Sequence, residues 1–377
     1  MKRLALLFSL AITGSALAAP STKTILPERF DPQYPTMQNW AQAGVLVDEI
    51  QQESPLVVRL KPGDDLTAAA ASDNTTIYLA PGNYPLEETL TIGSHVIIHG
   101  SGIGQTRLVI MLRDLQNAPT EEANHAMPEA TGVLFENTIG SGIENLSITM
   151  DESLLKPNAP HTGPYAYENN PHGQDDLHIT LVRFTNSRSS WLKNCELLNA
   201  GSHPLILDDS QHLTIEGTEI YGAYNKSDSL GMVILSGVEF CLLDGMLISD
   251  INHVLLRGGN DDRKSRYNVI ANSRITVDVR FQSLNTDYNL LENCEIAVPP
   301  THHAPPISYL TKTNELPSTN LLFLCTITRD FPTGNRRFSV AGNPNKVYRL
   351  LGATSLKTSI EEFGEAPIRN TLWPVRF

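Results

Sequence analysis

Two stretches of the chain place residues suited to acid–base and anion-binding chemistry at alternate positions. HVLLRG carries His253 and Arg257 on either side of aliphatic residues. DVRFQS carries Asp278, Arg280 and Gln282 with the same alternation. Alternate side chains of a β-strand point to the same face, so these polar residues face outward if Val, Leu and Phe between them are buried. Such an outward cluster can bind an anion and move a proton.

Aligning further strands by their aliphatic residues extends this cluster. HPLILD contributes His203 and Asp208, and GMVILS contributes Ser236. We predict that His253, Arg257 and Arg280 are catalytic. The predicted substrate-binding residues are His203, Asp208, Tyr165, Tyr167, Tyr224, Asp278 and Gln282. The alternative is a ladder of surface salt bridges such as Arg280 with Asp278, which is common and of little energetic value.

The chemistry that fits these residues is β-elimination on a uronic acid. That reaction requires neutralisation of the sugar carboxylate and a base that removes the proton at C5. Arg257 or Arg280 can hold the carboxylate through two N–H groups, with His253 as the base or acid. The sequence indicates no definite cofactor, and Ca²⁺ held by Asp or Glu is the alternative means of neutralisation.

A short pattern explains how these strands are positioned. A turn residue, two further residues and an aliphatic recur at intervals of 21 to 31 residues in the later copies, as in NCEL (194–197), NSRI (272–275) and NCEI (293–296). Short strands broken by Asn and Gly at such a period indicate a parallel β-solenoid. Asn145, Asn194, Asn272 and Asn293 are then expected in one row at a corner, where Asn tolerates left-handed backbone.

The four cysteines do not have zinc-site spacing. Cys195, Cys294 and Cys325 share one position of the repeat, so we expect them to be stacked in the core. A Cys294–Cys325 disulfide is geometrically allowed between neighbouring coils, but we favour free buried thiols.

Three insertions precede strands of the same type, at 151–178, 221–230 and 297–306. Insertions of a solenoid gather on one edge, which is often the binding face. Tyr165, Tyr167 and Tyr224 lie in these loops and can stack on sugar rings. The alternative is that these tyrosines only pack the loops against themselves.

The stretch TIYLAPGNYPLEETLTIGSHVIIHGSGIGQTRLVI (76–110) resembles the opening coils of pectate-lyase-like proteins. That resemblance implies an all-β, right-handed parallel β-helix with long loops on one edge. Apolar residues spaced through 36–54 are interpreted as its N-terminal capping helix. The expected organisation is a signal peptide (1–19), a lead-in and cap (20–75), the β-helix (76–345) and a C-terminal cover (346–377).

The stretch VLLRGG…NVIANSRI also resembles the arginine-bearing coil of the chondroitinase B and alginate lyase family. The resemblance implies that Arg257 is catalytic. The preceding coil of that family carries a catalytic lysine, where this chain has Ser236 and Gly237, so the chain departs from the pattern there.

Two other functions remain open from the sequence. A glycoside hydrolase of the polygalacturonase type would use paired carboxylates, and the chain contains DD (208–209) and NTD (285–287), although in the reverse order. A non-catalytic module would bind glycans along the same face. We predict a polysaccharide lyase that acts on an acidic, uronate-containing polysaccharide.

The first nineteen residues combine a basic start, an apolar run and small residues, which is typical of a secretory signal. We therefore expect a periplasmic or extracellular protein. Removing Lys2 and Arg3 with the signal leaves 26 basic against 41 acidic residues. Such a charge disfavours nucleic acid and anionic membranes. We expect a monomer with a polysaccharide substrate and no membrane insertion.

Overall fold

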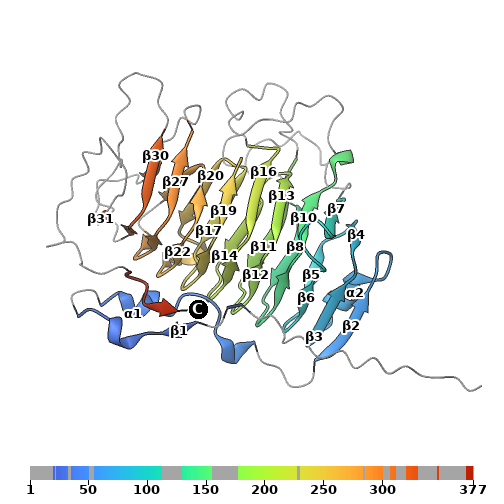
Figure 1. Ribbon diagram of the computed structural model, residues 1–377. Helices are drawn as coiled ribbons and strands as arrows, with labels where there is room; N and C mark the ends of the chain where they lie inside the picture. Colours follow the sequence, from blue (N-terminus) through green and yellow to red (C-terminus); the bar gives the residue numbers. More distant parts are fainter. Residues whose placement is uncertain are drawn as a thin grey trace, which may run out of the picture.

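The computed structural model shows a right-handed parallel β-helix (Figure 1). It describes residues 20, 21, 23–32, 35–50, 55–112, 130–154, 177–226, 230–282, 285–299, 306–310, 320–329, 346–347 and 371–376. Each full coil contributes one strand to each of three parallel sheets, which we call the first, second and third sheet in chain order. The signal sequence predicted for 1–19 lies outside the described residues.

The described part of the first sheet has eleven strands: β2 (Leu56–Leu60), β3 (Thr75–Leu79), β6 (Ile97–His99), β9 (Gly142–Glu144), β12 (Trp191–Lys193), β15 (Thr214–Glu216), β18 (Leu242–Asp244), β22 (Val269–Ala271), β26 (Leu290–Glu292), β29 (Leu321–Phe323) and β31 (Lys346–Val347). The second sheet has nine in the same residues: β4 (Gly82–Leu86), β7 (Thr106–Ile110), β10 (Ser147–Met150), β13 (Glu196–Ala200), β16 (Glu219–Ala223), β19 (Leu247–Ser249), β23 (Arg274–Ile275), β27 (Glu295–Val298) and β30 (Thr326–Arg329).

The third sheet has eight strands in the described chain: β5 (Leu90–Ile92), β8 (Ala130–Glu136), β11 (Ile179–Thr185), β14 (Leu205–Asp208), β17 (Met232–Ser236), β20 (His253–Arg257), β24 (Asp278–Gln282) and β28 (Ile307–Leu310). Two short pairs complete the strands: β1 (Thr24–Ile25) with β32 (Val375–Arg376), and β21 (Ser265–Arg266) with β25 (Thr286–Asp287). The helical segments are η1 (Pro27–Arg29), α1 (Met37–Trp40), η2 (Val47–Glu49), α2 (Leu66–Ala70), η3 (Glu152–Leu154) and η5 (Asn260–Asp262).

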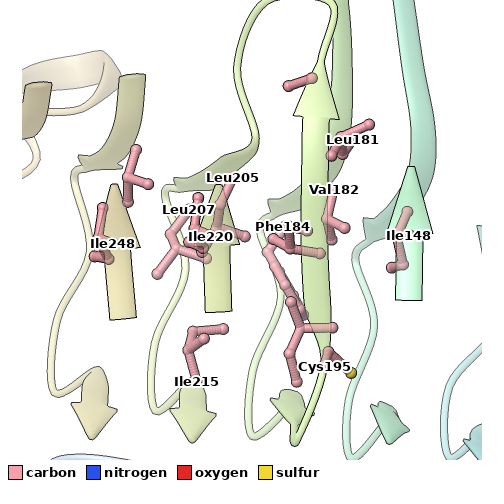
Figure 2. Packing of buried hydrophobic residues seen from close by; sticks show 14 of the residues in the cluster. Ile148, Leu181, Val182, Phe184, Cys195, Leu205, Leu207, Ile215, Ile220 and Ile248 are labelled. Carbon is pink, nitrogen blue, oxygen red and sulfur yellow. The ribbon is translucent and has the colours of Figure 1, made fainter. Parts of the chain in front are cut away.

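The core lies inside the coils, where alternate aliphatic and aromatic side chains of successive strands stack. Val254 and Leu256 pair in register with Val279 and Phe281, and all four are fully buried. Figure 2 shows the same packing one to three coils earlier, with Phe184 among aliphatic side chains from all three sheets. Burial of these rows supplies the main stabilisation of the stack, and it sets which residues face outward.

The asparagine row predicted at one corner is confirmed. Asn145, Asn194, Asn272 and Asn293 have φ between 49° and 56°. Their amides bond along the stack, with Asn293 Nδ2 donating to Asn272 Oδ1 at 2.8 Å. Asn is the residue that adopts this left-handed backbone at least cost after Gly, so the repeat in the sequence marks the turn between the first and second sheets.

The cysteines are buried free thiols. Cys294 and Cys325 precede paired positions of β27 and β30, as the repeat predicts. The hydrogen bond with Cys325, together with burial, raises the pKa of the Cys294 thiol well above its ordinary value. The two thiols therefore act as small apolar groups of the core.

Residues 36–50, the described part of the segment 36–54, are not the end cap that the apolar spacing suggested. Within residues 36–50 the helical segments are α1 and the short η2, and this stretch lies along the outer face of the first sheet (Figure 1). Trp40 packs on Leu242 and Leu290, and its Nε1 donates to the carbonyl of Tyr288 at 2.7 Å. The first coil is closed instead by α2, which buries Leu66 and Ala70 in the main core. The apolar residues of 36–50 thus find partners on a sheet face rather than at the open end.

The two terminal segments lie side by side, since β1 pairs antiparallel with β32. Among the described residues, no helix has both the length and the apolar character needed to span a bilayer.

Candidate functional site

The candidate site is the outer face of the third sheet, where strand register brings distant residues into three rows. An edge row contains Asp208, Ser236, Arg257 and Gln282 on successive strands. A central row runs through Arg183, Ile206, Ile234, Leu255 and Arg280. A third row contains Met232, His253 and Asp278. The outward alignment predicted for the HVLLRG and DVRFQS strands is the register that the structure has.

Asp278 joins His253 and Arg280 into one buried group. Its Oδ1 lies 2.5 Å from His253 Nδ1, and its Oδ2 accepts from Arg280 Nε at 2.7 Å. The Asp278 side chain is fully buried, that of His253 is 3% exposed and that of Arg280 is 25% exposed. Because an ionised carboxylate only accepts hydrogen bonds, Nδ1 carries a hydrogen and the basic lone pair of a neutral imidazole sits on Nε2. The carboxylate therefore fixes the orientation of both the imidazole and the guanidinium.

The edge row forms a second polar group. Arg257 is exposed, and its Nε donates to Ser236 Oγ at 3.3 Å. Ser236 also hydrogen-bonds to Asp208, which is half-buried. Burial and then the charge of Asp209 raise the pKa of Asp208, whereas Ser236, Arg183 and Arg257 lower it. Gln282 stands beside Arg257 on the next strand and is exposed.

Arg183 is a residue of this face that the sequence interpretation missed. It lies on β11 in the central row and acts electrostatically on Asp208. The signal was present, because Val182-Arg183-Phe184 repeats the pattern Val279-Arg280-Phe281. The two arginines thus occupy equivalent outward positions four coils apart.

An apolar patch lies beside the two polar groups. Ile206, Met232, Ile234 and Leu255 form one cluster on the outer face, and each is 6% exposed or less. On β20 this patch places Leu255 between His253 and Arg257, whereas on β24 the polar residues Asp278, Arg280 and Gln282 follow one another on the outer face.

Two of the predicted binding residues, His203 and Tyr224, differ from the expected arrangement. His203 is buried, and its Nδ1 lies 3.1 Å from Met232 N, so it contacts backbone beside His253. Tyr224 is 4% exposed within the main core, and burial raises its pKa to about 12; its ring does not present a stacking face. Tyr165 and Tyr167 lie outside the described residues.

No group of three or more His, Cys, Asp or Glu side chains in the described ranges is arranged to hold a metal ion. The carboxylates of the face also have other partners: Asp278 binds His253 and Arg280, and Asp209 accepts from Asn260 Nδ2 at 2.9 Å. On the described residues, the positive charge of this face comes from arginines.

No family model matches the sequence, and no curated protein sequence matches it. Solved structures with a similar fold include a polygalacturonase from Erwinia carotovora ssp. carotovora, at 12% identity and TM-score 0.49 over 76% of this chain and 97% of that one. An alginate lyase from Paenibacillus sp. str. FPU-7 matches at 10% identity and TM-score 0.41, over 74% of this chain and 96% of that one. A surface adhesin of Streptococcus pneumoniae matches at 9% identity and TM-score 0.37, over 73% and 70%. At these values the likeness concerns the coiled architecture alone, and function has to be argued from the site.

Proposed function

We propose that this protein is a secreted polysaccharide lyase that cleaves an acidic, uronate-containing polysaccharide by β-elimination on the outer face of the third sheet. The observation that carries the proposal is the clamp made by Asp278, whose two oxygens engage His253 and Arg280. In a chain with 41 acidic against 28 basic residues, this group orders a guanidinium that is 25% exposed and a buried imidazole beneath the same face.

In the proposed reaction, Arg280 binds the carboxylate of the uronate at the cleavage site. Neutralising this charge lowers the pKa of the C5–H bond and stabilises the enolate that forms. His253 Nε2 removes the C5 proton, and the Asp278 carboxylate stabilises the imidazolium that results. Breaking the C4–O4 bond then forms the C4–C5 double bond, and the departing O4 takes up the proton from the His253 imidazolium, which restores the neutral imidazole.

Arg257 is assigned to the neighbouring sugar. It is exposed and has no carboxylate within ion-pair distance among the described residues, so its fork of N–H groups is available to a uronate carboxylate. Ser236 supports the guanidinium from the preceding strand. This arrangement pairs an anionic substrate with a guanidinium that makes no ion pair within the described residues.

A glycoside hydrolase is the second candidate, and one observation favours it. The pKa of Asp208 is raised by burial and by the charge of Asp209, which suits a general acid. Hydrolysis also needs a second carboxylate that activates water or attacks the sugar. Asp208 and the lyase residues lie on the same face, so the products distinguish the two reactions.

The test is a panel of pectate, alginate and chondroitin, with ultraviolet absorbance for unsaturated ends and a reducing-end assay on the same samples. The lyase proposal expects unsaturated ends from at least one polymer. Reducing ends without unsaturation would establish the hydrolase instead, and binding without either product would establish a non-catalytic module.

Arg257→Ala is the first variant to examine on the active polymer. We expect activity to be lost while the thermal unfolding temperature stays unchanged, since the side chain is exposed and lies outside the core. The matched control is Arg274→Ala, because Arg274 is an exposed arginine of the same coil as Arg280 but belongs to the second sheet. Full activity in Arg257→Ala would contradict the assignment of the site.

A further inference from the structure

A hollow of about 430 Å³ lies at the turn between the third and first sheets. Its volume falls within the range of about 300–1,000 Å³ that is usual for small-molecule sites. The lining residues come from two coils and from the loop that contains η5: Gln211, Gly237, Glu239, Asp262, Arg263, Lys264 and Arg266. Three of these seven are cationic in a protein whose net charge is −13.

The cations of the hollow are not equivalent. Arg266 Nε contacts Glu239 Oε1 at 2.5 Å, and Lys264 Nζ lies 3.2 Å from Asp287 Oδ2. Arg263 instead donates from Nη1 to the carbonyl oxygen of Asp209 at 3.0 Å and, within the described residues, has no carboxylate at ion-pair distance. A guanidinium has five N–H donors, so this anchor leaves a positioned charge and several donors of Arg263 for a ligand.

The hollow lies close to the edge row of the candidate site. Gly237, which lines it, follows Ser236 in the chain, and Gly259 follows Arg257 by two residues. The two glycines touch, since a Cβ on Gly259 would lie 2.7 Å from Gly237 Cα. Gly237 also has φ of 62°, a conformation that favours glycine. A Cβ at either position would meet Asp209 Oδ1 and the backbone of the facing glycine, so the two turns pack against each other there.

We propose that this hollow binds a further uronate residue of the polysaccharide that occupies the candidate site. Arg263 holds its carboxylate, with Gln211 and Asp262 facing its hydroxyl groups. The inference rests on the proposed function and adds to it a binding site for an acidic sugar beyond the third sheet. This binding mode requires the polymer to bend around the corner of the β-helix. The affinity then depends on the length of the polysaccharide.

The experiment measures Kd by calorimetry for hexasaccharides and disaccharides of galacturonate and of mannuronate, and for hexasaccharides whose carboxyl groups have been reduced. Arg263→Gln should weaken the binding of the acidic hexasaccharide by about tenfold, the loss of one charge-assisted hydrogen bond. Disaccharides and reduced hexasaccharides should bind the variant and the wild type equally. Arg263→Lys, which keeps the charge, should give an intermediate Kd, and Arg274→Gln is the control.

Three results separate this proposal from the proposed function. If the wild type binds no acidic oligosaccharide, both are wrong. If the wild type binds the hexasaccharide, Arg257→Ala loses it and Arg263→Gln binds like the wild type, the hollow is not a binding site although the function stands. If Arg263→Gln weakens acidic and reduced hexasaccharides alike, the residue only shapes the loop, and a carboxylate site in the hollow is excluded.

Discussion

The outer faces of the first and third sheets both carry buried carboxylates, but their partners differ. On the first sheet, Glu292 is 6% exposed and accepts from the backbone N–H groups of Leu372 and Trp373 at 2.9 and 3.0 Å. On the third sheet, Asp278 binds the side chains of His253 and Arg280. A buried carboxylate therefore does not by itself mark a functional site. Burying a carboxylate costs free energy on either face, and on the first sheet the buried carboxylate anchors a terminal segment.

The two outer faces also differ in how far other segments cover them. Met37, Trp40, Leu372 and Trp373 cover the outward aliphatic residues of the first sheet. On the third sheet, Arg257 and Gln282 stay exposed at the ends of their strands. The segments around α1 and β32 thus pack on the outer face of the first sheet, whereas the third sheet retains exposed polar side chains.

The largest expected effect is that of Asp278→Asn on catalysis. The amide keeps the shape but no longer holds His253 in one tautomer or stabilises its charged form, so kcat/KM should fall by roughly 10²- to 10⁴-fold. The measurement is kcat/KM on the active polymer, together with its pH profile. Glu292→Gln is the matched change on the first sheet and should leave kcat/KM within about twofold of the wild type. Equal losses in both variants would remove the distinction between the two faces.

The second prediction concerns the pH dependence of stability through Glu292. Burial raises the pKa of this carboxyl to about 7, against the hydrogen bonds from Thr371, Leu372 and Trp373. The hydrogen bonds agree with a protonated carboxyl: Thr371 has one hydroxyl hydrogen but contacts both Glu292 Oε1 and the carbonyl of Trp373. A proton on Glu292 satisfies both contacts.

Since the folded pKa lies above the ordinary value of 4.5, the folded state binds this proton more tightly than the unfolded state. The contribution of Glu292 to the free energy of unfolding is complete below pH 4.5 and is lost as the pH rises to about 7. This contribution is at most about 3 kcal/mol. Glu292→Gln imitates the protonated form and should flatten this decline in urea unfolding between pH 5 and 8. Glu295→Gln, an exposed carboxyl of the next strand, is the control. A decline that persists unchanged in Glu292→Gln would assign it to other groups.

The smallest effect is expected at the corner between the first and second sheets, outside both faces. Asn293→Gly keeps the left-handed conformation of φ 54° and loses one amide bond of the row. Asn293→Ala also meets the steric cost of that conformation. We expect unfolding free energies lower by about 0.5 and about 1–2 kcal/mol respectively, with unchanged kcat/KM. A catalytic defect in either variant would mean that the activity of the site depends on this corner of the β-helix.

Much of the fold follows from local patterns that any coil must satisfy. The Asn turns and the aliphatic positions predicted the register that places His253 beside Asp278 and Arg257 beside Gln282. Arg183 was missed although its strand has the same pattern as that of Arg280. Tyr224 was expected in a binding loop but is buried in the core. A tyrosine in a loop has no periodic neighbours that show whether its ring points inward.

The sequence by itself determined the repeating part of this protein: the turn residues, the inward rows and hence the outward rows of each strand. These depend on neighbours within a few residues, because burial alternates along each strand and left-handed corners select Asn or Gly. Only the tertiary structure decided the packing of 36–50 on the first sheet, the clamp of Asp278 and the hollow beside Arg263. These depend on loops of different length and on which apolar surfaces meet, and neither is encoded in the spacing of one coil.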